Sequence, residues 1–262
     1  MRILKLPLSL PDFLSTVQSR SGEMMLRVPT TDILLHSSED ASLVHGLSLL
    51  KQTIQIYESE KNIAGEESKK NLDLFRESQL RLVGTEMVPF ISSFYEGDVP
   101  SLEAPYIVIS INYNQLAEYC LDKNIPLIRC KYEDKVNIKT LHEQLDIEYD
   151  KVFYKNGNIG FARGSQFVSL IQKAIIEMRP ETYAHQQEWR VILFKKEEEI
   201  NYTNILGSID TDVPFMIPCN CITKVDLLPD FKRYPYYYTI LIGWMKKAGL
   251  NPDRLLSSLA EV

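Results

Sequence analysis

The sequence lacks any long hydrophobic run. Among its 262 residues, no apolar stretch approaches the roughly 20 residues that a membrane-spanning helix requires. The opening segment, residues 1 to 11, also lacks the apolar core and the cleavage site of a secretory signal peptide. We therefore expect a cytoplasmic protein that does not associate with a membrane.

Cysteine and basic charge are both scarce. The chain has four cysteines, of which Cys219 and Cys221 form a C-x-C pair, while Cys120 and Cys130 form no matching pair. This spacing favours structural thiols over a zinc site, and we predict no bound metal. The formal net charge of −6 gives no general attraction for phosphate backbones, so nucleic acid is not an expected partner.

Motifs that identify several enzyme classes are absent. The sequence contains no P-loop, no dinucleotide-binding glycine fingerprint, no H-E-x-x-H and no motif of a serine or cysteine nucleophile. Its composition, 45% hydrophobic and 24% charged, is that of an ordinary globular protein. Composition thus predicts a folded protein without indicating an activity.

Hydrophobic periodicity predicts one α+β domain over residues 1–262. The fold that we expect is a mixed, largely antiparallel sheet packed with several helices. Residues 61–70 are charged and are expected to form an exposed, mobile loop, and Asn114 is expected to cap a short helix. The expected helices are 39–60, 72–82, 114–122, a short piece at 139–141, 165–178 and 240–247, and the expected strands are 25–28, 87–95, 106–113, 125–132, 183–194, 214–218 and 222–228.

The stretch most suggestive of chemistry is residues 183–194, where polar groups run directly into an apolar strand. Read as a strand throughout, it places Gln186, Glu188 and Arg190 on one face and Trp189 on the other. A carboxylate and a guanidinium side by side near an apolar face need partners, because partial burial is costly for either charge. Two interpretations stay open: these charges fasten the strand while Trp189 fills the core, or Glu188 is a catalytic group.

Several segments together resemble the bacterial family catalogued as domain of unknown function 2971. The most recognisable motif of that family, E-x-E-W-R, is similar to residues 186–190, which contain Glu188, Trp189 and Arg190. Further similar segments are Ser37-Ser38-Glu39 with His45-Gly46-Leu47, residues 89–94 with Glu96-Gly97-Asp98, Leu227-Leu228-Pro229, Gly249-Leu250-Asn251 and Ser257-Ser258.

The chain also departs from the family pattern. Gln186 replaces the first glutamate of E-x-E-W-R, the aspartate of the first motif is missing, and residues 99–105 replace an aromatic and glycine-rich segment. If the family has a catalytic site built from these motifs, this chain has lost part of it.

The order of elements in the resemblance is similar to that of ADP-ribosyltransferases, which split NAD. This implies an ADP-ribosyltransferase-like fold in which Glu188 is the catalytic group, because a carboxylate stabilises the developing oxocarbenium charge or orients the acceptor. Ser92 or Ser93 would line the nicotinamide side of a site for NAD, the expected substrate. Arg190 would support Glu188 or bind a phosphate, and Arg27 would contact the nucleotide.

Two functions are therefore expected. The first is a nucleotide-binding ADP-ribosyltransferase-like enzyme, in a toxin or in defence against phage. The second is a non-catalytic relative that binds a protein partner. The enzyme requires Glu188 to reach a concave pocket shared with Ser92 or Ser93, whereas a Glu188 carboxylate held in ion pairs away from a cleft favours the second.

Overall fold

The fold is that of a computed structural model, which describes residues 1–10, 12–13, 18–20, 23–29, 41–63, 88–102, 105–152, 174, 176–195, 199–205, 208–228, 235–247 and 250–256. The chain divides into two compact units. The sheet unit comprises Met1–Thr30, Pro89–Ile128 and His185–Val262, and the helical unit comprises Thr31–Val88 and Arg129–Ala184. Segments of the two units alternate along the sequence, so no single linker separates them. A single domain over residues 1–262 stays a prediction.

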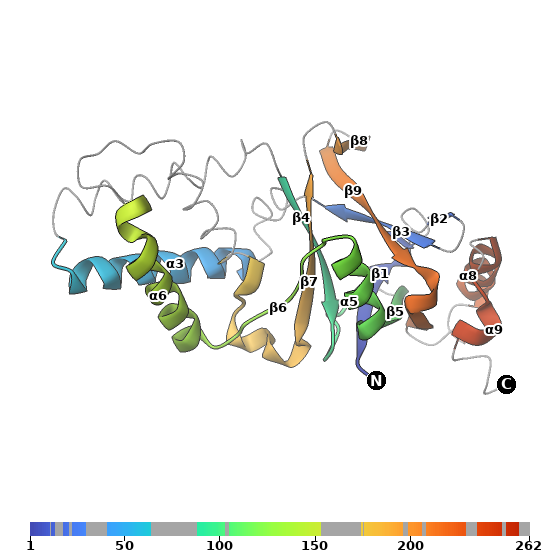
Figure 1. Ribbon diagram of the computed structural model, residues 1–262. Helices are drawn as coiled ribbons and strands as arrows, with labels where there is room; N and C mark the ends of the chain where they lie inside the picture. Colours follow the sequence, from blue (N-terminus) through green and yellow to red (C-terminus); the bar gives the residue numbers. More distant parts are fainter. Residues whose placement is uncertain are drawn as a thin grey trace. The chain divides into compact units, whose positions relative to one another are not determined.

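The larger sheet of the sheet unit has six strands in the order β10-β5-β1-β4-β7-β6 (Figure 1). Its strands are β1 (Ile3–Ser9), β4 (Val88–Tyr95), β5 (Tyr106–Asn112), β6 (Leu127–Arg129), β7 (Glu188–Lys195) and β10 (Ile222–Leu228). The pairs β1–β4, β1–β5 and β5–β10 are antiparallel. Together with the helices, this sheet confirms the predicted α+β class with a largely antiparallel sheet.

The smaller sheet has four strands in the order β2-β3-β9-β8. They are β2 (Gln18–Arg20), β3 (Glu23–Pro29), β8 (Asn201–Ile205) and β9 (Ser208–Pro218). Alternation along β3 buries Met24, Leu26 and Val28, whereas Arg27 is exposed. The chain passes from β9 through the short 3₁₀ helix η4 (Cys219–Cys221) directly into β10 of the larger sheet.

Three helices complete the described part of the sheet unit. They are α5 (Tyr113–Asp122), α8 (Pro235–Lys247) and the single turn α9 (Pro252–Leu255). The predicted cap of α5 at Asn114 is wrong. Asn112 is the N-cap, since its extended backbone lets the side chain accept hydrogen bonds from the backbone N–H groups of Asn114 and Gln115.

The helical unit contains α3 (Ala41–Glu60), which matches the predicted helix, and α6 (Asp134–Val152). The expected short helical piece at 139–141 is wrong, because α6 runs for 19 residues. Leu141, Leu145 and Tyr149 recur every fourth residue along it and are all buried. This stripe packs against α3, and the Tyr149 hydroxyl donates to the buried Glu58 carboxylate at 2.8 Å.

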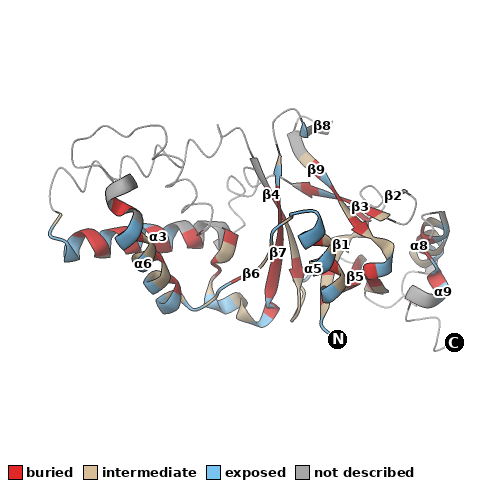
Figure 2. Cartoon of the chain, viewed as in Figure 1, coloured by how far each residue is buried: buried red, intermediate tan, exposed pale blue. Residues whose placement is uncertain are grey.

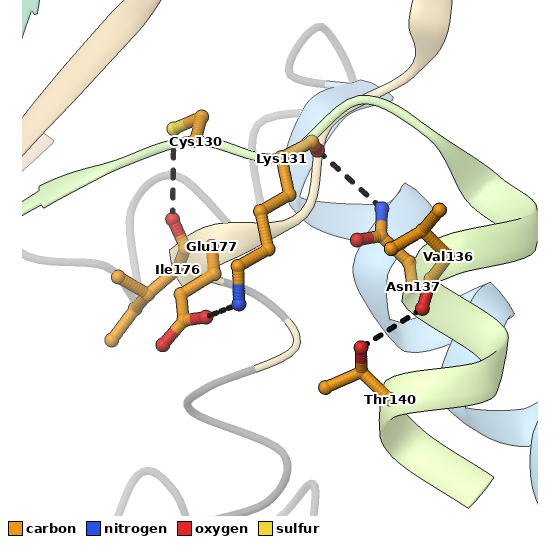
Figure 3. A network of polar contacts seen from close by, with 7 residues as sticks. All are labelled: Cys130, Lys131, Val136, Asn137, Thr140, Ile176 and Glu177. Carbon is orange, nitrogen blue, oxygen red and sulfur yellow. Dashed lines mark hydrogen bonds and ion pairs between the residues drawn. The ribbon is translucent and has the colours of Figure 1, made fainter.

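A polar network fastens the start of α6 within the helical unit (Figure 3). The Lys131 ammonium pairs with Glu177 at 2.7 Å. The fully buried Asn137 donates from Nδ2 to the Lys131 carbonyl oxygen at 3.5 Å. Backbone bonds from Lys131 N to Glu177 O and from Arg179 N to Lys131 O join the same two segments. These contacts hold together residues far apart in the sequence.

Several predictions fall outside the described residues. They are the helix at 72–82, most of the loop at 61–70 and most of the helix at 165–178. Within the described ranges, no helix is long and apolar enough to cross a membrane.

Candidate functional site

The sequence predicted a strand over residues 183–194. This prediction is wrong for residues 183–187, which do not form part of β7. Residues Glu181–Gln186 form the 3₁₀ helix η2, Gln187 has a positive φ of 46°, and the strand begins at Glu188. The carbonyl oxygens of residues 185–187 accept hydrogen bonds from the backbone N–H groups of Asp98, Gly97 and Glu96. Residues 185–187 are therefore held by backbone hydrogen bonds to the segment that follows β4, and not within a strand. Gln186 consequently does not share a strand face with Glu188.

Glu188 lies at the centre of a polar cluster between the neighbouring strands β4 and β7. The Ser93 hydroxyl donates to Glu188 Oε1 at 2.5 Å, and Arg190 Nε donates to the same oxygen at 2.7 Å. The predicted proximity of Glu188 and Arg190 is therefore confirmed. Ser93 joins them, although it is 95 residues away from Glu188 in the sequence.

The Ser93–Glu188–Arg190 cluster is deeply buried at its charged end. The side chains of Glu188 and Arg190 are 1% and 3% exposed, whereas Ser93 is half-buried. Figure 2 shows buried residues along most of β7. Removing two such charges from water costs several kcal/mol per ion, and their hydrogen-bonded contact offsets this cost. The roles expected for Arg190, to support Glu188 or to bind a phosphate, stay predictions.

Two of the predicted site residues do not join the cluster. Ser92 is next to Ser93 on β4, and adjacent residues of a strand face opposite sides of the sheet. Arg27 lies on β3 in the smaller sheet, where Nη1 is 3.7 Å from an Asp212 carboxylate oxygen and the side chain is 40% exposed. The roles predicted for these residues in nucleotide binding stay predictions.

Trp189, between Glu188 and Arg190, is 7% exposed and belongs to a second cluster. Its indole N–H donates to Glu96 Oε2 at 3.2 Å, and its ring centroid lies 4.8 Å from that of Tyr113. The Arg2 guanidinium pairs with Glu96 Oε1 at 2.9 Å and covers both rings. The sequence predicted a buried Trp189 but not these partners, because no local pattern links Arg2 to Glu96.

An open groove lies elsewhere in the sheet unit, between α5 and η4. It has a volume of about 680 Å³, and its lining consists of Gln115, Glu118, Tyr119, Leu121, Asp122, Pro218, Asn220 and Cys221. This groove is not among the sites predicted from the sequence. A signal was nevertheless present, because Gln115, Glu118 and Asp122 recur at the spacing of one helix face.

The cysteines around this groove are free thiols. Burial raises the pKa of Cys120 to about 12 and that of Cys221 to about 11, and it also raises the pKa of Cys219. These thiols therefore stay protonated at neutral pH and are poor nucleophiles. Among the residues that the structure describes, no group of three or more histidine, cysteine or acidic side chains is arranged to hold a metal ion.

No protein-family model matches the chain, and comparisons with curated proteins and with solved structures likewise gave no match.

Proposed function

We propose that the chain is a non-catalytic binding module for a protein partner, and that the Ser93–Glu188–Arg190 cluster stabilises its sheet. In this proposal it is a cytoplasmic, degenerate relative of the domain of unknown function 2971 family. The observation that carries the proposal is the burial of the Glu188 side chain, which is 1% exposed and ion-paired with Arg190.

Burial matters here because catalysis requires contact with the substrate. A carboxylate that stabilises an oxocarbenium ion must lie within reach of the reacting sugar. Instead, Glu188 Oε1 accepts hydrogen bonds from both the Ser93 hydroxyl and the Arg190 guanidinium. The groove between α5 and η4 is lined by other residues. Both features support a structural role for Glu188.

A second candidate function is an ADP-ribosyltransferase-like enzyme that binds NAD as substrate, as a toxin or a component of phage defence. One observation favours it: Ser93, expected on the nicotinamide side of such a site, donates to Glu188, the expected catalytic group. In this candidate the half-buried Ser93 marks the side from which substrate would approach, and Arg190 holds the Glu188 carboxylate in position.

Incubation with NAD separates the two candidates. For the binding module we expect millimolar NAD to leave the melting temperature unchanged and to release no nicotinamide. The variants are Glu188→Gln and Ser93→Ala, with Ser92→Ala as the matched control on the opposite strand face. Nicotinamide release that Glu188→Gln and Ser93→Ala abolish, and that Ser92→Ala retains, would overturn the non-catalytic proposal.

A further inference from the structure

The groove between α5 and η4 has two chemically different walls. The first wall is the outer side of α5, which carries Glu118 and Asp122, both exposed. The second wall is the end of β9 with η4, which contributes Pro218 and Cys221. Figure 1 labels α5 and β9, and α5 contacts both β9 and η4. All residues that line the groove belong to the sheet unit.

The groove has a negative charge. Glu118 and Asp122 form no ion pair with any described residue, and the charge of Glu23 on β3 contributes to raising the pKa of Tyr119, after the larger effect of burial. The Lys123 ammonium, which is not part of the lining, lies 6.0 Å from the Tyr119 ring centroid. The two carboxylates of the lining, Glu118 and Asp122, each carry a charge of −1, so the formal charge of the lining is −2. A cationic occupant is thus complementary to this surface.

The carboxylates are spread along the groove rather than gathered at one point. Glu118 and Asp122 are four residues apart on α5, an axial separation of about 6 Å. Alternate side chains of an extended peptide are separated by about 6.6 Å and point to the same side. Two basic side chains at alternate positions of an extended chain therefore match these two carboxylates. The groups are not arranged to hold a metal ion within the described part of the chain.

The second wall suits the remaining side chains of such a peptide. In an extended chain, the side chains between the basic ones point the opposite way, toward the wall that contains Pro218. Leu121, which is 82% exposed, adds an apolar contact at the edge of the groove.

We propose that this groove binds an extended segment of a partner protein in which basic and apolar side chains alternate. The inference rests on the proposed function, since it identifies the surface with which the binding module would contact its partner. The basic side chains pair with Glu118 and Asp122, and the apolar ones pack on Pro218 and Leu121.

The probe is a fluorescein-labelled peptide of about ten residues in which arginine and leucine alternate, long enough to span the two turns of α5 that line the groove. Fluorescence anisotropy with the full chain gives its Kd. We expect saturable binding that weakens as salt rises, because the contacting charges are exposed. An acidic peptide in which glutamate replaces arginine should not bind.

Variants determine whether binding is at the groove. Glu118→Gln/Asp122→Asn should raise the Kd by about tenfold or more, and Leu121→Ser should raise it severalfold without changing the charge. The matched control is Glu133→Gln/Glu143→Gln, which changes the net charge equally at exposed positions of the helical unit. The control should change the Kd by less than about twofold.

Equal losses in both double variants would show diffuse electrostatic attraction and overturn the groove proposal, as would the absence of binding. Circular dichroism of each variant checks that a loss is not due to unfolding. Failure of the groove proposal is distinguishable from failure of the proposed function. The first appears in the peptide titration, whereas the second appears as nicotinamide release that depends on Glu188.

Discussion

Replacement of Arg190 by methionine tests the structural role of the buried cluster most directly. The substitution keeps much of the side-chain volume and removes the guanidinium that contacts Glu188 Oε1 at 2.7 Å. The carboxylate, which is 1% exposed, then loses the charged partner that offsets its burial. The cluster would retain the Ser93 hydroxyl as a donor, which cannot neutralise a full charge.

The expected magnitude follows from two opposing energies. At 2.7 Å and an effective dielectric constant of about 20, the Coulomb attraction is about 6 kcal/mol. Burial costs several kcal/mol for each ion, so the intact pair contributes little net stability. Removal of one partner leaves the burial cost of the other without compensation. We therefore expect Arg190→Met to lower the free energy of unfolding by about 3 to 5 kcal/mol.

A double-mutant cycle measured by urea unfolding, with circular dichroism and tryptophan fluorescence as probes, tests this reasoning. Glu188→Leu/Arg190→Met should cost less than Arg190→Met alone, because no buried charge remains. Arg27→Met is the matched control, since Arg27 is 40% exposed and its nearest Asp212 oxygen is at 3.7 Å. It should cost less than about 1 kcal/mol. A cost for Arg190→Met no greater than that of the control, or additive single effects, would refute a compensated buried pair.

Three further predictions concern stability. Trp189→Ala should cost about 3 to 5 kcal/mol in urea unfolding, because the indole is buried; a cost below about 1 kcal/mol would contradict that packing. Gly97→Ala should cost about 1 to 3 kcal/mol, since the new Cβ would lie 2.0 Å from the His185 carbonyl oxygen. In α8, a Cβ added at Gly243 meets no atom within 4 Å, so Gly243→Ala should stabilise the fold by about 0.5 to 1 kcal/mol. Equal effects of Gly97→Ala and Gly243→Ala on stability would contradict the close contact at Gly97. Burial raises the pKa of Cys120 to about 12 from an ordinary value of 9.0. Below pH 9 the thiol is neutral in both the folded and the unfolded state, but between pH 9 and 12 it ionises only in the unfolded state, so the free energy of unfolding falls as the pH rises. Unfolding at alkaline pH should accordingly show a smaller pH dependence in Cys120→Ala, and an unchanged pH dependence would exclude this thiol as a cause.

The regular elements were largely predictable. The predicted bounds of β3, β4, β5 and β10 agree with the observed ones to within about two residues. These strands were predictable because a strand that buries one face has alternating apolar residues, and one that buries both faces is a continuous apolar run. The apolar stripe of α3 likewise predicted a long helix. The length of α6 was not predicted. Among the described residues, its buried apolar stripe consists of only Leu141, Leu145 and Tyr149, and the many charged residues around them obscured the helical pattern.

The candidate site was only partly predictable. Glu188 and Arg190 are two residues apart, so their contact followed from strand geometry once β7 was assigned. The choice of Ser93 over Ser92 as the third member depends on the register of β4 against β7, which decides which serine lies on the same face of the sheet as Glu188. Local sequence does not encode that register. The turn at residues 185–187 was equally hidden, because it is held by backbone bonds to Glu96, Gly97 and Asp98.

The sequence by itself determined the fold class, most strands and the position of the one stretch in which polar groups enter the core. These follow from local periodicity, since burial acts on each segment through its own side chains. Only the tertiary structure decided that Glu188 is buried and compensated, and that α5 and η4 enclose an acidic groove. Those properties depend on residues about 100 positions apart, and pairings over such distances are set by the packing of the whole sheet unit.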